Sequence, residues 1–363
     1  MDRLDGPGSL RPAAGRQNGA DFTPHPLLRG GRAQTIAANF LPRNFALPPS
    51  ERRLFQVEAI APILPDGNGD APSRQVQVMC KCNWQPRRDQ AVTLLLVHGL
   101  EGSSESQYMI GTAGKAWAAG MNVVRMNIRN CGGTESLGPT LYHSGMSDDI
   151  GHVVRELLAG NGAERIGRIA LAGFSMGGNQ VLKLAGEWGR DGAVPRQLVA
   201  VAAVSPAMDL AVSADALHLP RNRVFEWRFL FSLRQTLRRK QCLFPEQFQT
   251  SKQWWRSIRD FDDCVTAPNC GFRDAADYYE QASASRVAEF ITLPTLVVHS
   301  LDDPFIRITP PTQTKLAANP RVRFVLTEHG GHCAFLAADR HPNGDRRWVE
   351  HQIVDFVRGV NGC

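Results

Sequence analysis

The chain has 363 residues, of which 43% are hydrophobic and 21% charged, and its formal net charge is +6. This composition is typical of a soluble globular protein, and the length allows one large domain with an insertion or two smaller domains. The positive charge is modest, and no recognised nucleic-acid-binding motif accompanies it, so we do not expect nucleic acid as a partner.

The sequence also indicates in which cellular compartment the protein is expected. Residues 1–32 are rich in Gly, Pro and Arg and lack the apolar stretch of a signal peptide. No run approaches the roughly eighteen uninterrupted apolar residues that a membrane-spanning helix needs. The eight cysteines lack the paired C-x2-C spacing of a structural zinc site and are too few for a disulfide scaffold. We therefore expect a cytoplasmic protein without a transmembrane segment, for which peripheral membrane contact stays open.

The first elements in chain order are an arm and two strands. Residues 1–50 are expected to form a disordered or loosely wrapped N-terminal arm. Residues 54–60 and 76–82 alternate enough to be antiparallel edge strands. Residues 92–97 are almost all apolar, as expected of a central strand that is covered on both faces.

Strands and helices then alternate along most of the remaining chain. Further strands are predicted at 123–126, 169–172, 198–204, 296–299 and 322–326, and helices near 107–119, 146–159, 178–188, 311–318 and 346–359. This alternation predicts an α/β fold with a mostly parallel central sheet and helices on both faces, in two core parts at 51–207 and 291–363.

The interval 208–290 interrupts the alternation and is expected to be a helical cap insertion. It is rich in aromatic residues and arginines. Around 224–240 the apolar residues run most of the way round a helical wheel, which does not support a cleanly amphipathic membrane-surface helix. We expect these side chains to pack the cap onto the core or to line a substrate groove.

The most informative motif is Gly173-Phe174-Ser175-Met176-Gly177, between a predicted strand and a predicted helix. A G-x-S-x-G in this setting is typical of the nucleophile elbow of α/β-hydrolases, in which glycines flank a strained serine. Ser175 is therefore the candidate nucleophile. Chance alone could supply the pentapeptide, so its weight depends on the partners that follow it.

Serine needs a base, and the base needs an acid to orient it. His332 lies on a glycine-containing loop after the last predicted strand, and His329 is its competitor nearer the strand end. After the preceding strand, Asp303 is preferred as the acid and Asp302 is the alternative. The order of serine, acid and histidine is that of an α/β-hydrolase.

The oxyanion of a tetrahedral intermediate needs two N–H donors. One is expected from Met176, directly after the nucleophile, and the second from Leu100 in the loop 98–102 after the third predicted strand. A serine mechanism supplies its own nucleophile and base, so no metal or organic cofactor is implied.

Together these residues resemble the YheT-like hydrolases and their eukaryotic abhydrolase-domain relatives, a branch of the α/β-hydrolase superfamily. The resemblance covers essentially residue 22 to the C-terminus. It rests on His98-Gly99-Leu100-Glu101-Gly102, Tyr142-His143-Ser144-Gly145, Gly173-Phe174-Ser175-Met176-Gly177-Gly178-Asn179, Phe261-Asp262-Asp263, Asp277-Tyr278-Tyr279, Asp302-Asp303-Pro304-Phe305 and Glu328-His329-Gly330-Gly331-His332.

The resemblance implies an esterase with Ser175 as nucleophile, Asp303 as acid and His332 as base, acting on short-chain or acylglycerol-type esters. One departure is Arg32, where relatives usually carry histidine. The segment 129–133 is a variant of the family's loop after the fourth strand, with an entrance-shaping role and a plain structural turn as equal alternatives.

Three functional readings follow. The leading one is a carboxylic-ester hydrolase with a small-molecule or lipid-like ester as substrate. Thioesterase, amidase or acyltransferase chemistry would use the same three residues. A non-catalytic ligand-binding or scaffold protein on a hydrolase fold is the alternative from another class, because a fold does not guarantee activity.

Overall fold

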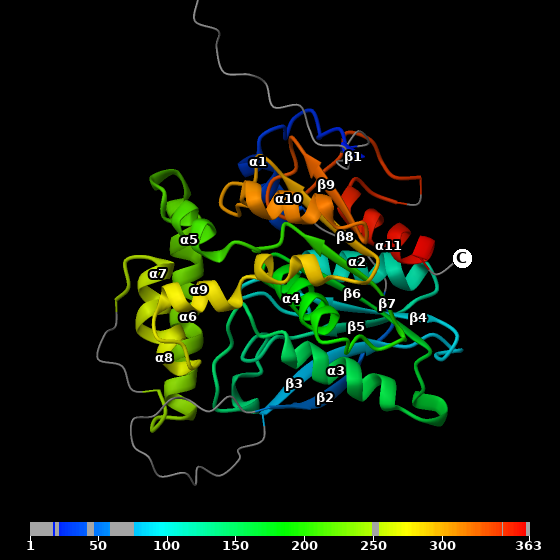
Figure 1. The fold of residues 1–363 in the computed structure, drawn as a ribbon, viewed down its shortest axis with the longest axis horizontal. Coiled ribbons are helices and arrows are strands. Elements are labelled where there is room, and N and C mark those ends of the chain that lie inside the picture. The colour runs from blue at the N-terminus through cyan, green and yellow to red at the C-terminus, as the bar shows by residue number, and fades with distance from the viewer. Residues whose placement is uncertain are drawn as a thin grey trace, which may run out of the picture.

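The described chain is organised around one nine-stranded sheet (Figure 1). The computed structural model describes residues 17–18, 22–41, 47–58, 76–248, 254–342 and 344–360. The strand order is β1-β9-β8-β7-β6-β4-β5-β3-β2. The strands are β1 (Gln17–Asn18), β2 (Glu51–Val57), β3 (Val76–Asn83), β4 (Val92–Val97), β5 (Asn122–Met126), β6 (Arg168–Phe174), β7 (Leu198–Val204), β8 (Thr295–Ser300) and β9 (Val322–Thr327).

The sheet is mostly parallel, as predicted. Only the pairs β2–β3 and β3–β5 are antiparallel, and the six other pairings are parallel. Of the two predicted edge strands, β2 lies at an edge, whereas β3 lies between β2 and β5. The strand predicted at 54–60 begins earlier, at Glu51, and ends at Val57; residues 59–60 lie outside the described part.

Helices cover both faces, and the alternation of side chains along β4 shows why. Leu95 and Val97 join an apolar cluster with the helices at 148–159 and 176–190, whereas Leu94 and Leu96 join a second cluster with the helices at 107–118 and 348–360. All five helices predicted for the core are present. They are α2 (Gln107–Ala118), α3 (Asp148–Ala159), α4 (Met176–Arg190), α10 (Pro310–Ala318) and α11 (Trp348–Val360).

Between β7 and β8 the chain forms a group of helices at one end of the sheet, at the left in Figure 1. They are α5 (Leu210–His218), α6 (Arg223–Leu243), α7 (Ile258–Phe261), the π-helical turn η4 (Asp262–Thr266), α8 (Ala267–Asn269) and α9 (Ala275–Ala282). Their buried side chains form a third apolar cluster. We propose that residues 208–290 form the cap.

The apolar residues on all sides of α6 lie in two different environments. Leu230 and Leu237 are buried in the cap cluster, whereas Trp227 and Phe231 are exposed. The expectation that these aromatic residues pack the cap or line a groove is therefore wrong for Trp227 and Phe231.

Part of the N-terminal arm is folded onto the core. Helix α1 (Gly31–Phe40) is fastened by Gln34, whose side chain is fully buried. Its amide nitrogen donates to the Leu336 carbonyl at 3.1 Å, and its amide oxygen accepts from the Leu336 N–H at 2.7 Å. A loosely wrapped arm is thus the wrong description for residues 22–41. Residues 1–16, 19–21 and 42–46 of the expected arm lie outside the described part.

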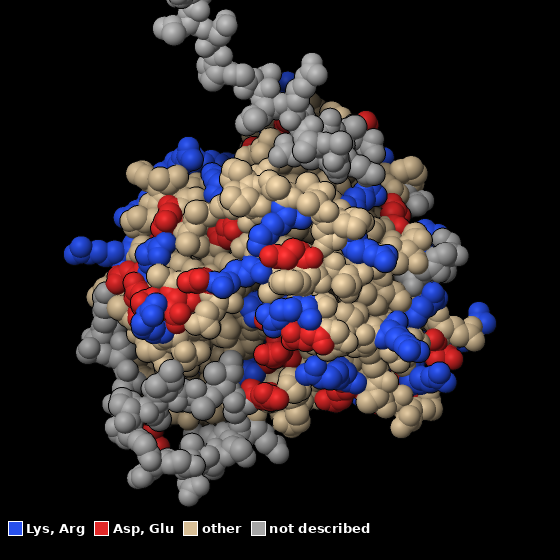
Figure 2. All heavy atoms as spheres, in the orientation of Figure 1, with Lys and Arg blue, Asp and Glu red and all other residues tan. Residues whose placement is uncertain are grey.

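The surface charge is mixed. On the face shown in Figure 2, basic and acidic side chains alternate rather than forming a basic stripe. Among the described residues, no helix has the length and apolar character required to cross a membrane.

Candidate active site

The site begins with a strained turn at Ser175, between β6 and α4. Ser175 has φ 55° and ψ −116°, a left-handed backbone conformation that a residue with a Cβ adopts only at a cost. A Cβ on Gly173 would lie 2.6 Å from the Gly178 nitrogen, and a Cβ on Gly177 would lie 2.5 Å from the Val97 carbonyl oxygen. Both flanking glycines are therefore required by close backbone approach, as in a nucleophile elbow.

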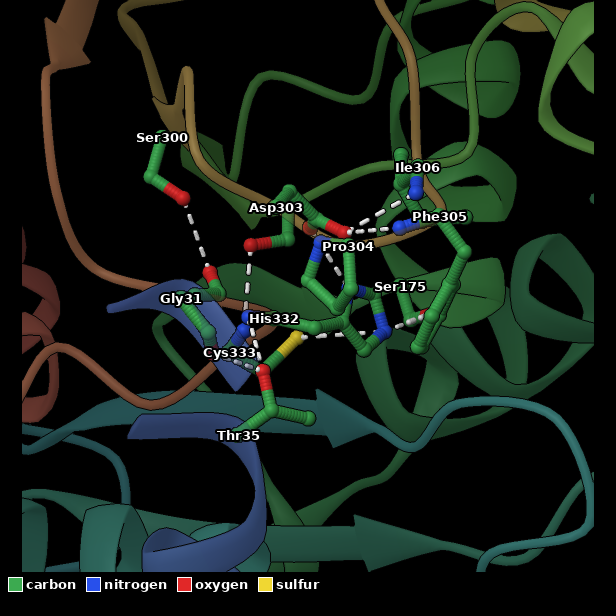
Figure 3. A network of polar contacts seen from close by, with 12 residues as sticks. Gly31, Thr35, Ser175, Ser300, Asp303, Pro304, Phe305, Ile306, His332 and Cys333 are labelled. Carbon is green, nitrogen blue, oxygen red and sulfur yellow. Dashed lines mark hydrogen bonds and ion pairs between the residues drawn. The ribbon is translucent and has the colours of Figure 1, made fainter. Parts of the chain in front are cut away.

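The structure brings Ser175, His332 and Asp303 together, as Figure 3 shows. The His332 Nε2 atom lies 2.9 Å from the Ser175 Oγ atom, and its Nδ1 atom lies 2.8 Å from the Asp303 Oδ2 atom. The other Asp303 oxygen accepts hydrogen bonds from the N–H groups of Phe305 and Ile306, at 3.1 and 2.9 Å. With Nδ1–H donating to the carboxylate, the unprotonated Nε2 can accept the serine proton.

The surroundings of Asp303 and His332 stabilise the carboxylate form of the first and the imidazolium form of the second. Burial opposes ionisation of Asp303, but the charge of His332 and its hydrogen bond outweigh that and lower the pKa of Asp303. Burial likewise opposes protonation of His332, yet the adjacent Cys333 sulfur and the Asp303 carboxylate raise the pKa of His332 above its ordinary value. An imidazolium formed on His332 is therefore stabilised where it stands.

The two competing residues pair with each other instead. Asp302 Oδ2 lies 3.2 Å from His329 Nδ1, and Asp302 Oδ1 accepts from the Gly331 N–H at 2.8 Å. This second pair fastens the loop that carries His332. Neither Asp302 nor His329 contacts Ser175 in this arrangement.

The two expected oxyanion donors lie on segments beside the serine. Met176 is the first residue of α4, so its N–H has no carbonyl partner within the helix. Gly99, next to Leu100, approaches the serine so closely that a Cβ there would lie 3.1 Å from the Ser175 Cβ. Leu100 and Met176 line the same cavity as Ser175.

His98 fixes the start of the loop that carries Leu100. Its Nδ1 lies 2.7 Å from the Gly99 carbonyl oxygen, and its Nε2 accepts from the Ile128 N–H at 3.1 Å. Burial lowers the pKa of His98 to about 4, so the imidazole is neutral with its proton on Nδ1. This residue is thus a loop anchor and not a second base.

Two further residues escaped the sequence analysis. Glu101 has φ 53°, and its carboxylate accepts from the Tyr142 hydroxyl at 2.6 Å and the Thr236 hydroxyl at 2.9 Å. Thr35 on α1 accepts from the His332 N–H at 2.8 Å. The motif around Glu101 could have drawn attention to it, but no local signal marks Thr35, which is 297 positions away from its partner.

The structure also shows what surrounds Arg129 and Arg32, which belong to the two segments that depart from the family pattern. Arg129 forms a buried ion pair with Asp149, with Nη2–Oδ1 and Nε–Oδ2 distances of 2.5 and 2.6 Å, which favours the structural alternative for the segment 129–133. Arg32 donates to the Asn222 side chain at 3.2 Å, linking α1 to the residue before α6.

Ser175 lies where two cavities meet. The inner cavity, about 970 Å³ with its open mouth, is walled mainly by apolar cap residues such as Leu217, Phe229 and Leu237. The outer cavity, about 1160 Å³ with its mouth, lies between α1, α6 and the loop 99–102 and also reaches His332. Both volumes are large enough for a small organic ligand.

Comparisons with known proteins identify the family of this chain. The profile described as "Alpha/beta hydrolase family" matches residues 94–341. The chain is 33% identical over 272 residues to a putative esterase, YheT, of Escherichia coli, covering 73% of this chain and 76% of that protein. It is 29% identical over 249 residues to the mouse phospholipase ABHD3, covering 67% of this chain but only 58% of that protein. A solved esterase from Pyrococcus furiosus, at 14% identity, shares the fold with a TM-score of 0.53, covering 88% of this chain and 96% of that one.

Proposed function

Because the chain belongs to the alpha/beta hydrolase family, we propose that it cleaves carboxylic esters through an acyl-enzyme formed on Ser175. The observation that carries this proposal is the position of His332, with one nitrogen 2.9 Å from the Ser175 Oγ and the other 2.8 Å from Asp303. A scaffold protein would have no need for a strained serine within hydrogen-bond reach of an oriented imidazole.

The proposed mechanism has two halves. His332 removes the proton from Ser175 as the oxygen attacks the ester carbonyl, and Asp303 stabilises the resulting imidazolium. The N–H groups of Met176 and Leu100 donate to the oxyanion, and His332 then protonates the leaving alkoxide. Water, deprotonated by the same imidazole, attacks the acyl-enzyme and releases the acid and Ser175.

The inner cavity supports an apolar acyl group. Its mainly apolar walls favour a hydrocarbon chain, so short-chain or acylglycerol-type esters are the proposed substrates. The outer cavity would then hold the alcohol portion of the ester. The prediction of a cytoplasmic location accompanies this proposal.

The test is turnover of a chromogenic short-chain ester by the wild type and by Ser175→Ala. We expect the variant to lose activity by at least about a thousandfold, because the acyl-enzyme cannot form. Ser285→Ala serves as a control and should leave activity unchanged, since Ser285 bonds to Lys315 and Met208 through its backbone and lines neither cavity. A fluorophosphonate should label the wild type and the control but not Ser175→Ala.

Equal turnover by the wild type and Ser175→Ala would refute the assignment of Ser175 as the nucleophile. A thioester with the same acyl group, measured in parallel, separates ester hydrolysis from thioesterase activity, which would use the same three residues.

A further inference from the structure

Exposed apolar side chains lie on α1 and α6, the two helices that wall the outer cavity. Ile36 and Phe40 project from α1, and Val224, Trp227 and Phe231 project from α6. Phe40 is 77% exposed and Trp227 is 61% exposed, which is unusual for rings of this size. We call these five residues the rim. Exposed apolar groups that gather on neighbouring helices mark an interaction surface more often than isolated ones do.

The rim on α6 forms one face of the helix. Val224, Trp227 and Phe231 are spaced three and four residues apart, so they share a side. Arg228, four residues after Val224, and Arg238, seven residues after Phe231, are exposed and lie next to these residues on the helix. Among the described residues, neither arginine forms an ion pair with an acidic side chain. The exposed face of α6 therefore combines large apolar groups with available positive charge.

The rim is connected to the candidate active site. Ile36, Phe40 and Arg228 line the outer cavity, and Ser175 and His332 line the same cavity further in. The hydrogen bond from Arg32 to Asn222 joins α1 to the start of α6, so the two helices hold the mouth between them. A partner that covers Ile36, Phe40 and Arg228 faces the entrance to Ser175.

We propose that the rim docks onto an anionic lipid surface and that the ester substrate enters the outer cavity from that surface. This proposal rests on the proposed function, since it assigns the source of the substrate of the same site. Aromatic and aliphatic groups interleaved with arginine are suited to the boundary between headgroups and acyl chains. The mainly apolar inner cavity suits the acyl chain of a lipid-like ester.

The position of the rim favours a lipid surface over a folded protein partner. A protein seated on Ile36, Phe40 and Arg228 would close the mouth, whereas a lipid surface brings substrate to it. The weak amphipathicity of the α6 sequence does not oppose this assignment. Its inner face is apolar because it packs in the cap, and only the exposed face is available for docking.

The test separates docking from turnover. Full-length Ser175→Ala protein is mixed with sedimenting vesicles of phosphatidylcholine, with or without phosphatidylserine, and the bound fraction is measured. We expect binding to the vesicles that contain phosphatidylserine and a decline of that binding with added salt. Adding Trp227→Ser and Phe231→Ser should weaken binding by about tenfold or more, because two rings no longer insert. Arg228→Gln with Arg238→Gln should weaken it by about fivefold for each arginine.

A matched control removes apolar exposure elsewhere. Leu54 on the edge strand β2 is 49% exposed, and Leu54→Ser should leave vesicle binding unchanged. In the otherwise wild-type protein, Trp227→Ser with Phe231→Ser should retain turnover of a soluble short-chain ester and lose turnover of an ester held in anionic vesicles. Neither residue lines either cavity. Unchanged melting temperatures verify that the variants are folded.

Three outcomes would overturn the inference. The first is equal vesicle binding by the ring variant and by Leu54→Ser. The second is binding that ignores both phosphatidylserine and salt. The third is a wild-type dimer that the ring variant converts to a monomer without any vesicle binding, which would make the rim an interface between two copies. Vesicle binding without turnover of any ester would instead reject the proposed function and leave the docking surface in place.

Discussion

Glu101 offers the sharpest test of how the site is held together, because it joins three segments. It lies on the loop that carries Leu100, and it accepts hydrogen bonds from Tyr142 and from Thr236 on α6. Both hydroxyl-bearing residues are more than nine-tenths buried. Glu101→Ala would leave two buried hydroxyls without their acceptor.

The expected cost follows from these contacts. An unsatisfied buried polar group costs about 1–3 kcal/mol, so Glu101→Ala should lower the free energy of unfolding by about 2–4 kcal/mol. Glu101→Gln should cost only about 1 kcal/mol, because a hydroxyl can rotate to accept from the amide and keep both contacts. Urea denaturation measures both values. Ester turnover should fall at least about tenfold in Glu101→Ala, because the Leu100 N–H, which we propose as an oxyanion donor, would be displaced.

The pH dependence gives an independent check. Burial raises the pKa of Glu101, and the hydrogen bonds from Tyr142 and Thr236 oppose this only in part. The folded state therefore holds the Glu101 proton more tightly than the unfolded state does. The stabilisation is complete below the unfolded pKa of roughly 4.3 and is lost as pH rises through the folded pKa. Wild type should thus gain stability relative to Glu101→Gln as pH falls from neutral.

Two results would refute this reasoning. One is a Glu101→Ala variant as stable and active as Glu101→Gln. The other is a stability difference between wild type and Glu101→Gln that shrinks as the pH falls. Thr236→Val is the partial control, because it removes the link to α6 and retains the bond from Tyr142.

Three further predictions concern His332, the elbow and α1. Asp303→Asn should reduce kcat/KM and move the acid limb of its pH profile to lower pH, because the carboxylate that raises the pKa of His332 is gone; an unmoved limb would contradict the pairing. Gly177→Ala should lower the melting temperature and abolish ester turnover, since its Cβ would meet the Val97 carbonyl, whereas Gly359→Ala in α11, with open space around it, should stabilise by about 0.5–1 kcal/mol in thermal unfolding. Thr35→Val should lower kcat more than it changes KM, because it removes the acceptor of the His332 N–H. Thr35→Ser keeps a hydroxyl at this position and should retain the wild-type kcat.

The sequence was most informative where local chemistry decides the structure. The apolar run that became β4 and the glycines around Ser175 required particular backbone environments, and the structure supplies both. The choice between Asp302 and Asp303 was harder, since both follow the same strand and only tertiary geometry separates their partners. Thr35 was out of reach, because its role depends on a helix that folds back against the His332 loop.

The exposed rim and the arm share one reason for being missed. A helical wheel counts apolar residues but does not say which face packs, so Trp227 and Leu230 looked equivalent although one is exposed and the other buried. Gln34 is polar, and nothing in its neighbourhood announces that its amide pairs with the Leu336 backbone. Patterns of hydrophobicity predict elements well and predict their long-range partners poorly.

The core around Ser175 holds this residue in its strained conformation. A left-handed non-glycine residue costs about 1–3 kcal/mol and persists only where its surroundings over-determine it. The Ser175 N–H donates to the Val204 carbonyl at 2.9 Å, and its carbonyl accepts from Asn179 and Ala207 at 3.0 and 3.2 Å. These bonds tie the turn to β7, to α4 and to the chain after β7. The parallel strands and the two glycines therefore serve the same end, since they hold one hydroxyl in a conformation that the serine alone would not adopt.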